Sequence, residues 1–233
     1  MKERIYSIPL TEALEENSVC PLCTLESKLQ EQAVEYFLGP SMMEPDSREM
    51  TNEKGFCKNH IKMLFDRKNR LSLALMLETH IKELEKTMEI PKKSGMFSKE
   101  APADIFVRNL YKKATSCALC EKLDSQMSDA AENFAYLWAN EADFRKMLEN
   151  SKGLCLEHTA LAVQKSSGEI HGKKKEEFLL MLAENQKKQL SVLYENLHNF
   201  TLSFDYRNAG KELTPEEKES VKTAISYLSK DIK

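Results

Sequence analysis

The placement of the cysteines constrains this chain more than any other feature of its sequence. The pattern CxxC followed by CxxH occurs twice, and it contains all six cysteines of the chain. Residues 24–56 separate the two halves of the first copy and residues 121–154 those of the second, so a gap of one residue aligns them. Isolated cysteines are usually small buried hydrophobes, but two matched motifs indicate a shared chemical role.

Three thiolates and one imidazole form a Cys₃His set, which completes the tetrahedral coordination of Zn²⁺ and leaves no position open for water. We therefore predict two structural zinc ions per chain, one for each copy of the motif. The predicted ligands are Cys20, Cys23, Cys57 and His60 in the first copy, and Cys117, Cys120, Cys155 and His158 in the second; ligands shared between the copies are the alternative grouping. Iron-sulfur clusters with a histidine ligand and metal-free redox thiols are the alternatives.

Matching positions between the cysteines indicate an internal duplication. Examples are Leu22 with Leu119, Phe37 with Phe134, and Gly55 with Gly153. We predict a first helical repeat over residues 1–95, a second over residues 96–205, and a C-terminal helix within residues 206–233 that packs on the bundle.

Composition favours an all-α fold, because glycine and proline number only seven each and leucine outnumbers isoleucine plus valine by roughly two to one. We expect an internally duplicated helical bundle in which each metal joins a pair of helices. Helical periodicity and capping residues predict helices from about Cys20 to Leu38, Cys57 to Glu89, Pro102 onward, Cys117 to Ala139, Glu141 to Asn150, Lys174 to Thr201, and Thr214 onward. Gly39 to Lys54 is predicted to be irregular, and Pro91 to Ala101 to be a linker.

These helices place each CxxC and each CxxH at or near a helix N-terminus. The partial positive charge there favours thiolate over thiol, which assists metal loading and also makes a thiol more reactive. The position of the motifs at helix N-termini therefore supports the zinc interpretation and the redox interpretation equally. The remaining histidines, His80, His171 and His198, have no ligand partner at a useful spacing and are predicted to be ordinary surface or core residues.

Charge and hydropathy exclude several classes of function. Lys and Arg number 34 against 37 Asp and Glu, giving a net charge of -3, so nucleic acid and anionic membranes are not expected partners. Apolar runs such as Leu73 to Leu77 are too short to span a bilayer, and the N-terminal residues lack an apolar signal region. We therefore expect a cytoplasmic protein with reduced thiols.

Phosphate-binding, metalloprotease and nucleophile-elbow motifs are missing from the sequence. The favoured function is accordingly a non-enzymatic interaction module that presents a surface to a protein partner, which the sequence does not identify. A thiol or zinc redox sensor is the first alternative. An iron-sulfur protein in electron transfer is the second.

The duplicated CxxC…GFCxxH and CxxC…GLCxxH motifs, with the DYRN that follows the last long helix, resemble an uncharacterised family of bacterial helical proteins, mostly from clostridia-like anaerobes. The resemblance covers nearly the whole chain and implies a helical fold and metal ligation at the same eight positions, without implying an activity. One departure between the copies is Leu154, where the first copy has Phe56. This difference leaves the ligands untouched.

Overall fold

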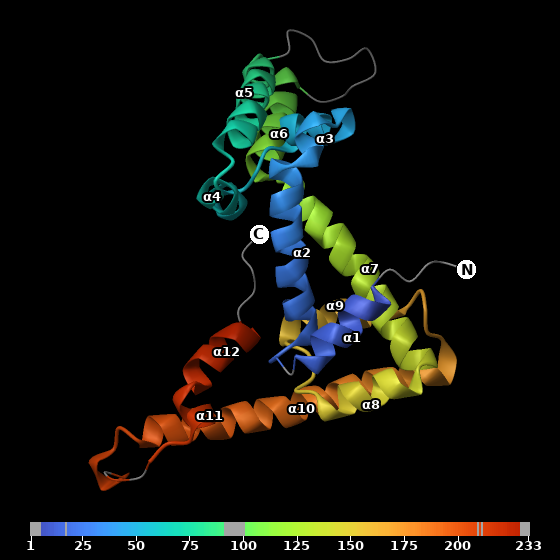
Figure 1. The fold of residues 1–233 in the computed structure, drawn as a ribbon, viewed down its shortest axis with the longest axis vertical. Helices are drawn as coiled ribbons and strands as arrows, with labels where there is room; N and C mark the ends of the chain where they lie inside the picture. Colours follow the sequence, from blue (N-terminus) through green and yellow to red (C-terminus); the bar gives the residue numbers. More distant parts are fainter. Residues whose placement is uncertain (1–5, 17, 91–100, 209, 211, 229–233) are drawn as a thin grey trace. The chain divides into compact units, whose positions relative to one another are not determined.

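A computed structural model describes residues 6–16, 18–90, 101–208, 210 and 212–228. Every regular element among these residues is a helix, so the predicted all-α fold is confirmed for the described part of the chain (Figure 1). The predicted linker from Pro91 onward lies outside the described residues, apart from Ala101 at its end.

The chain divides into two compact units. Unit 1 combines Met1–Ser27 with Met127–Lys233, and unit 2 consists of Lys28–Gln126. Helices α2 (Pro21–Leu38) and α7 (Ala118–Asn140) each begin in one unit and end in the other. Unit 2 is therefore inserted within the sequence of unit 1. The predicted repeats over 1–95 and 96–205 concern sequence duplication and stay a prediction.

Unit 1 holds the two chain ends and the longest helix. Its elements are α1 (Ser7–Glu15), the start of α2, the greater part of α7, α8 (Ala142–Asn150), α9 (Leu156–Ser166), α10 (Gly172–Leu202), η2 (Tyr206–Asn208), α11 (Pro215–Lys218) and α12 (Ser220–Leu228). The core of this unit contains an aromatic group. Phe134 packs edge-on against Phe144, and Trp138 lies 4.9 Å from Phe178 between ring centroids. Trp138 is thus a packing residue.

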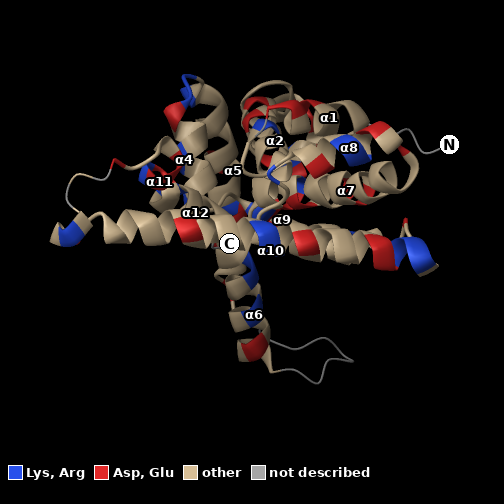
Figure 2. Ribbon diagram, turned by 90° about the horizontal axis from the view of Figure 1, so that it is seen from below, with Lys and Arg blue, Asp and Glu red and all other residues tan. Residues whose placement is uncertain are grey.

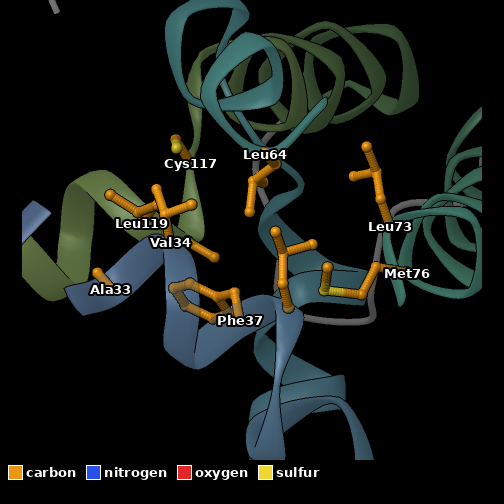
Figure 3. Packing of buried hydrophobic residues seen from close by; sticks show 10 residues of the cluster. Ala33, Val34, Phe37, Leu64, Leu73, Met76, Cys117 and Leu119 are labelled. Carbon is orange, nitrogen blue, oxygen red and sulfur yellow. The ribbon is translucent and has the colours of Figure 1, made fainter. Parts of the chain in front are cut away.

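Unit 2 contains the remainder of α2 and the shorter helices. Its elements are η1 (Pro40–Met43), α3 (Pro45–Lys54), α4 (Lys58–Asp66), α5 (Arg70–Thr87), α6 (Pro102–Thr115) and the start of α7. The core lies where α2 meets α4, α5 and the start of α7 (Figure 3). Phe37, Leu64 and Leu119, which come from three different helices, are fully buried in it.

Three of the predicted elements differ from the structure, and one of them is the final helix predicted from Thr214 onward, which is divided into α11 and α12. Gly39 to Lys54 is not irregular, because Pro40 opens η1 and Pro45 occupies the first turn of α3, positions where a missing N–H costs nothing. The single helix predicted from Cys57 to Glu89 is two helices, α4 and α5. The break is marked by Asn69, whose side chain accepts a hydrogen bond from the Ser72 N–H at 3.3 Å and so caps α5.

Within the described ranges, no helix combines the length and apolar character needed to cross a membrane. Acidic and basic side chains both occur along α10 and along α6 (Figure 2). This mixing agrees with the small net charge of -3.

Candidate metal centres

The eight motif residues gather into two groups, each with three cysteines and one histidine. The unit-1 site consists of Cys20, Cys23, Cys155 and His158, and the unit-2 site of Cys57, His60, Cys117 and Cys120. In each group the ligand atoms all lie within 4.8 Å of one another. Each group can therefore hold a metal ion.

The grouping differs from the expected one, because each CxxC meets the CxxH of the other copy. The expectation that Cys20 and Cys23 join Cys57 and His60 is wrong, as is the matching expectation for the second copy. Helix α2 has 18 residues and is about 27 Å long, so it carries the chain away from Cys23 before Cys57 is reached. Likewise, α7 runs from unit 2 into unit 1, which places the two halves of the second copy in different units.

In the unit-1 site the imidazole faces all three sulfurs. Nδ1 of His158 lies 3.5 Å from the Sγ of Cys20, 3.2 Å from that of Cys23 and 3.3 Å from that of Cys155. The Sγ atoms of Cys23 and Cys155 are 3.6 Å apart. Cys20, Cys155 and His158 are buried, and Cys23 is half-buried.

The unit-2 site repeats this arrangement with different helices. Nδ1 of His60 lies 3.3 Å from each of the sulfurs of Cys57, Cys117 and Cys120. The Sγ atoms of Cys57 and Cys120 are 3.9 Å apart, and both residues are half-buried. Cys117 and His60 are buried.

These separations fit four ligands around a single ion. With Zn–S bonds of about 2.3 Å and Zn–N bonds of about 2.0 Å, tetrahedral geometry gives about 3.8 Å between sulfurs and about 3.5 Å between sulfur and nitrogen. A disulfide would require about 2.05 Å between sulfurs, and all six cysteines are free. The separations between the donor atoms therefore match those of ligands to one shared metal ion and are too long for a disulfide bond.

All four motifs lie at helix N-termini, as predicted. Cys57 and Cys155 are the N-cap residues of α4 and α9, and Cys20 and Cys117 directly precede α2 and α7. The Cys155 Sγ accepts a hydrogen bond from the His158 N–H at 3.4 Å, and the Cys117 Sγ accepts one from the Cys120 N–H at 3.5 Å. Two helix dipoles therefore point their positive ends at each group of thiolates, which offsets part of its negative charge.

Each histidine has a second partner at its outer nitrogen, and both partners belong to α2. A carboxylate oxygen of Glu26 lies 3.4 Å from Nε2 of His158, and the side-chain amide of Gln30 lies 3.0 Å from Nε2 of His60. Turning the Gln30 amide places its oxygen as the acceptor for the Nε2–H. Metal-binding histidines are typically oriented in this way, with Nδ1 on the metal and the other N–H donated to an acceptor.

The ligands of the unit-1 site shift one another's pKa values in different directions. Hydrogen bonds with Cys155 and Cys20, followed by burial, raise the pKa of Cys23 far above its usual range. Hydrogen bonds from Cys20, Cys23 and His158 hold the pKa of Cys155 far below it. Burial opposes the charged form of His158, but hydrogen bonds with Cys155, Cys20 and Glu26 outweigh it and raise the pKa of His158 to about 12.

Three thiols packed this closely resist simultaneous ionisation, because each thiolate opposes the formation of the next. In the unit-2 site, burial raises the pKa of Cys117 and of Cys120, and the charge of Cys117 adds to the effect on Cys120. A divalent cation removes this resistance, because it stabilises all three thiolates and binds the neutral imidazole, releasing protons.

Glycine is required just before each CxxH. Gly55 and Gly153 have φ angles of 60° and 82°, in the left-handed region where other residues are strained. A Cβ at Gly55 would lie 2.4 Å from Nε2 of His80, and a Cβ at Gly153 would lie 2.1 Å from Nε2 of Gln189. His80 is thus an ordinary packing residue, as predicted. Its ring packs against Gly55, in the loop that leads to Cys57.

A polar network holds the Cys155 loop of unit 1 against α10. The Gln186 amide donates hydrogen bonds of 2.6 Å to the Leu154 carbonyl and to the Thr159 hydroxyl. The Tyr227 hydroxyl of α12 in turn donates to the Gln186 amide oxygen. Burial, followed by the charges of Cys155 and Cys20, raises the pKa of Tyr227, which places this hydroxyl in the electrostatic field of the metal site.

The whole chain, residues 1–233, matches the model of a family of unknown function, DUF6062. The chain belongs to this family. No curated protein and no solved structure matches the chain. Membership agrees with the resemblance to an uncharacterised helical family, and the chemistry of the chain has to be argued from its own residues.

Sequence reasoning missed Glu26 and Gln30. Both are detectable in retrospect, because they follow Cys23 at three and seven residues and therefore share its face of α2. A carboxylate or amide one or two turns beyond a CxxC at a helix start is a signal for the acceptor that orients a histidine ligand.

Proposed function

We propose that the chain is a zinc-binding helical protein, with two structural Cys₃His sites, that acts as a non-enzymatic interaction module. One observation carries the proposal: in each unit, the Nδ1 of one histidine faces three cysteine sulfurs at 3.2–3.5 Å. Soft thiolates with one imidazole are a preferred donor set for structural zinc.

The spacing of the donors supports a single ion over an iron-sulfur cluster. In a cluster the ligands bind different iron atoms, so their sulfurs stand farther apart than around one ion. The sulfur separations of 3.6 Å and 3.9 Å match the approximately 3.8 Å of a tetrahedral zinc site. The acceptor at the outer nitrogen of each histidine, Glu26 or Gln30, also supports ligation through Nδ1.

Closed coordination supports a non-enzymatic role, because four protein ligands leave no position for a substrate.

Exposed apolar side chains in unit 2 support a protein partner. Helix α6 has no buried residue, and its Val107 and Tyr111 are 62% and 71% exposed. Neighbouring α5 exposes Ile81, and Met88 at its C-cap is also exposed. Large apolar groups on adjacent helices are typical of a protein interaction surface.

Metal analysis tests the first part of the proposal. Protein purified anaerobically without chelator is expected to contain about two zinc ions per chain and to be colourless. Replacement by Co²⁺ is expected to give the visible absorption of a tetrahedral thiolate site. A brown protein that contains iron and acid-labile sulfide would show that the sites hold an iron-sulfur cluster and not zinc. Metal-free protein that does not bind added zinc would contradict both the zinc and the cluster assignments.

Site-specific cross-linking tests the second part. A photoreactive residue at Val107 or Tyr111 is expected to form a defined adduct with one protein in the source cells. The same residue at Lys146, an exposed position on α8, is the matched control and is expected to form none. Equal labelling at all three positions, or no adduct, contradicts a partner surface on α6.

A thiol redox sensor is the second candidate, and the half-buried sulfurs favour it. Cys57 and Cys120 are both half-buried and lie 3.9 Å apart. Two such zinc-bound thiolates can give one electron each to hydrogen peroxide. One S–S bond forms, the O–O bond breaks, two protons complete two water molecules, and Zn²⁺ is released. Peptide mapping after mild peroxide treatment is expected to show a disulfide that thiol reductant reverses. Zinc retention under these conditions contradicts the sensor.

A further inference from the structure

We infer that the two sites have different roles: the unit-1 site holds a permanent structural metal, and the unit-2 site exchanges its metal with the solution. This inference rests on the proposed zinc function and adds a division of labour between the sites. Three differences between them carry it, and all three concern residues around the ligands.

The first difference is the acceptor on the histidine. Glu26 places a carboxylate 3.4 Å from Nε2 of His158, whereas His60 has the neutral amide of Gln30 at 3.0 Å. A carboxylate increases the basicity of the imidazole and adds negative charge near the cation, so it strengthens metal binding more than an amide does. The unit-1 site should therefore release its zinc more slowly.

The second difference is access to the thiolates. In the unit-2 site Cys57 and Cys120 are half-buried, and their sulfurs are adjacent at 3.9 Å. In the unit-1 site Cys23 alone is half-buried, while Cys20 and Cys155 are 1% and 4% exposed. An incoming thiolate or chelator can thus reach the unit-2 metal. It forms a new bond to Zn²⁺ as one Zn–S bond to the protein breaks, and one anion replaces another.

The third difference concerns what holds the ligand loops together when the metal has left. In unit 2 the Ala118 N–H donates to the Gly55 carbonyl at 2.9 Å, and the Ser116 hydroxyl donates to the Lys54 carbonyl at 2.9 Å. These bonds join the CxxC loop directly to the CxxH loop. In unit 1 the residue after the first cysteine is Pro21, which has no N–H to donate.

The protein frame of the unit-2 site therefore persists without metal. An emptied unit-2 site keeps its two loops in place and can be refilled, which an exchangeable site requires. In the unit-1 site the Glu26–His158 contact joins α2 to α9 through side chains, so this site depends more on its ion, as a structural site does. The exchangeable ligand is a borderline-soft divalent cation, Zn²⁺ in the first instance.

Chelator competition with thiol labelling tests the inference on the full chain loaded with two zinc ions. Excess EDTA is added together with iodoacetamide, and zinc release and alkylation are followed over time. We expect two phases of one zinc ion each, separated at least tenfold in rate. The cysteines alkylated in the fast phase should be Cys57, Cys117 and Cys120. The other three should be alkylated only in the slow phase.

Reciprocal substitutions on α2 assign the phases. Glu26→Gln is expected to accelerate the slow phase about 10- to 100-fold and leave the fast phase unchanged, and Gln30→Glu to slow the fast phase alone. Glu35→Gln and Gln32→Glu, at exposed positions of the same helix, are matched controls expected to change neither phase. A merely structural effect of Glu26→Gln would accelerate both phases, so site-resolved rates separate the two roles.

Several outcomes overturn the inference. Release of both ions in one phase, with all six cysteines alkylated together, removes the division of labour. Alkylation of Cys20, Cys23 and Cys155 first reverses it. Failure to load two zinc ions at the start contradicts the proposed function instead. If Glu26→Gln does not fold, the order of alkylation in the unsubstituted protein still decides.

Discussion

Zinc stoichiometry in double cysteine variants gives a direct test of the crossed grouping of the motifs. Each single change, Cys20→Ser, Cys57→Ser or Cys155→Ser, is expected to reduce the zinc content from two ions per chain to one. Cys20→Ser combined with Cys155→Ser removes two ligands of the same site, so one zinc ion should remain. Cys20→Ser combined with Cys57→Ser damages both sites and should leave none.

The expected loss of zinc affinity for each variant follows from the number of ligands in each group. Structural zinc in small peptides binds with roughly 10–16 kcal/mol, which over four ligands is about 2.5–4 kcal/mol each. Losing one thiolate therefore weakens binding by about a hundredfold or more. A second loss at the same site adds little further destabilisation, because the ion has already gone. Two losses at different sites should lower stability by nearly the sum of the single effects.

The assay is native mass spectrometry in the presence of a competing chelator, with chemical denaturation for stability. His171→Ala is the control, because His171 is exposed and lies in neither group. Motif pairing within each copy predicts the opposite pattern. In that case the Cys20 and Cys57 pair would retain one ion and the Cys20 and Cys155 pair would retain none. That result would refute the crossed grouping.

Three further substitutions test the surrounding structure by denaturant unfolding. Gly55→Ala should cost about 1–3 kcal/mol from left-handed backbone strain alone, and it should also lower zinc occupancy in unit 2, whereas Gly168→Ala, with open space around it, should do neither. Phe37→Ala, in a fully buried position, should cost about 3–5 kcal/mol, and unchanged stability would contradict the assigned core. Phe204→Ala, at 77% exposure, is its control. Tyr227→Phe should cost about 1 kcal/mol by leaving the half-buried Gln186 amide oxygen without its donor, and a cost near zero would show that this hydrogen bond does not stabilise the fold.

Local chemistry was predictable from the sequence, and long-range pairing was not. Proline at the first turn and cysteine at the helix start are local signals, so the starts of α2, α4, α6 and α7 follow from their residues. Which CxxC meets which CxxH depends on where α2 and α7 carry the chain. Motif spacing is nearly the same in both copies and therefore contains no information on that choice.

The polar residues around the sites also have roles that depend on long-range contacts and that their local sequence does not predict. Gln186 reads as an interruption of an apolar stripe along α10, yet its amide binds the loop that carries Cys155. Its role becomes visible only when α9 and α12 are placed beside it. Glu26 and Gln30 likewise read as surface residues of α2 until a histidine from a distant part of the chain reaches them.

The crossed grouping also has a consequence for the order of folding during synthesis. The first three cysteines and one histidine to leave the ribosome are Cys20, Cys23, Cys57 and His60, a set that the native fold does not use. The unit-2 set is complete once Cys120 has been made, and the unit-1 set only once His158 has been made. The two native closures are nested, with unit 2 inside unit 1.

Loop closure itself differs little between the two sites. The unit-1 contact from Cys23 to Cys155 spans 132 residues, and the unit-2 contact from His60 to Cys117 spans 57. Their closure entropies differ by about 0.7 kcal/mol. The larger effect is kinetic, because an ion captured by the early set has to dissociate before α2 can meet α9. Zinc supplied before folding should therefore delay refolding, and zinc supplied after unit 2 has formed should not.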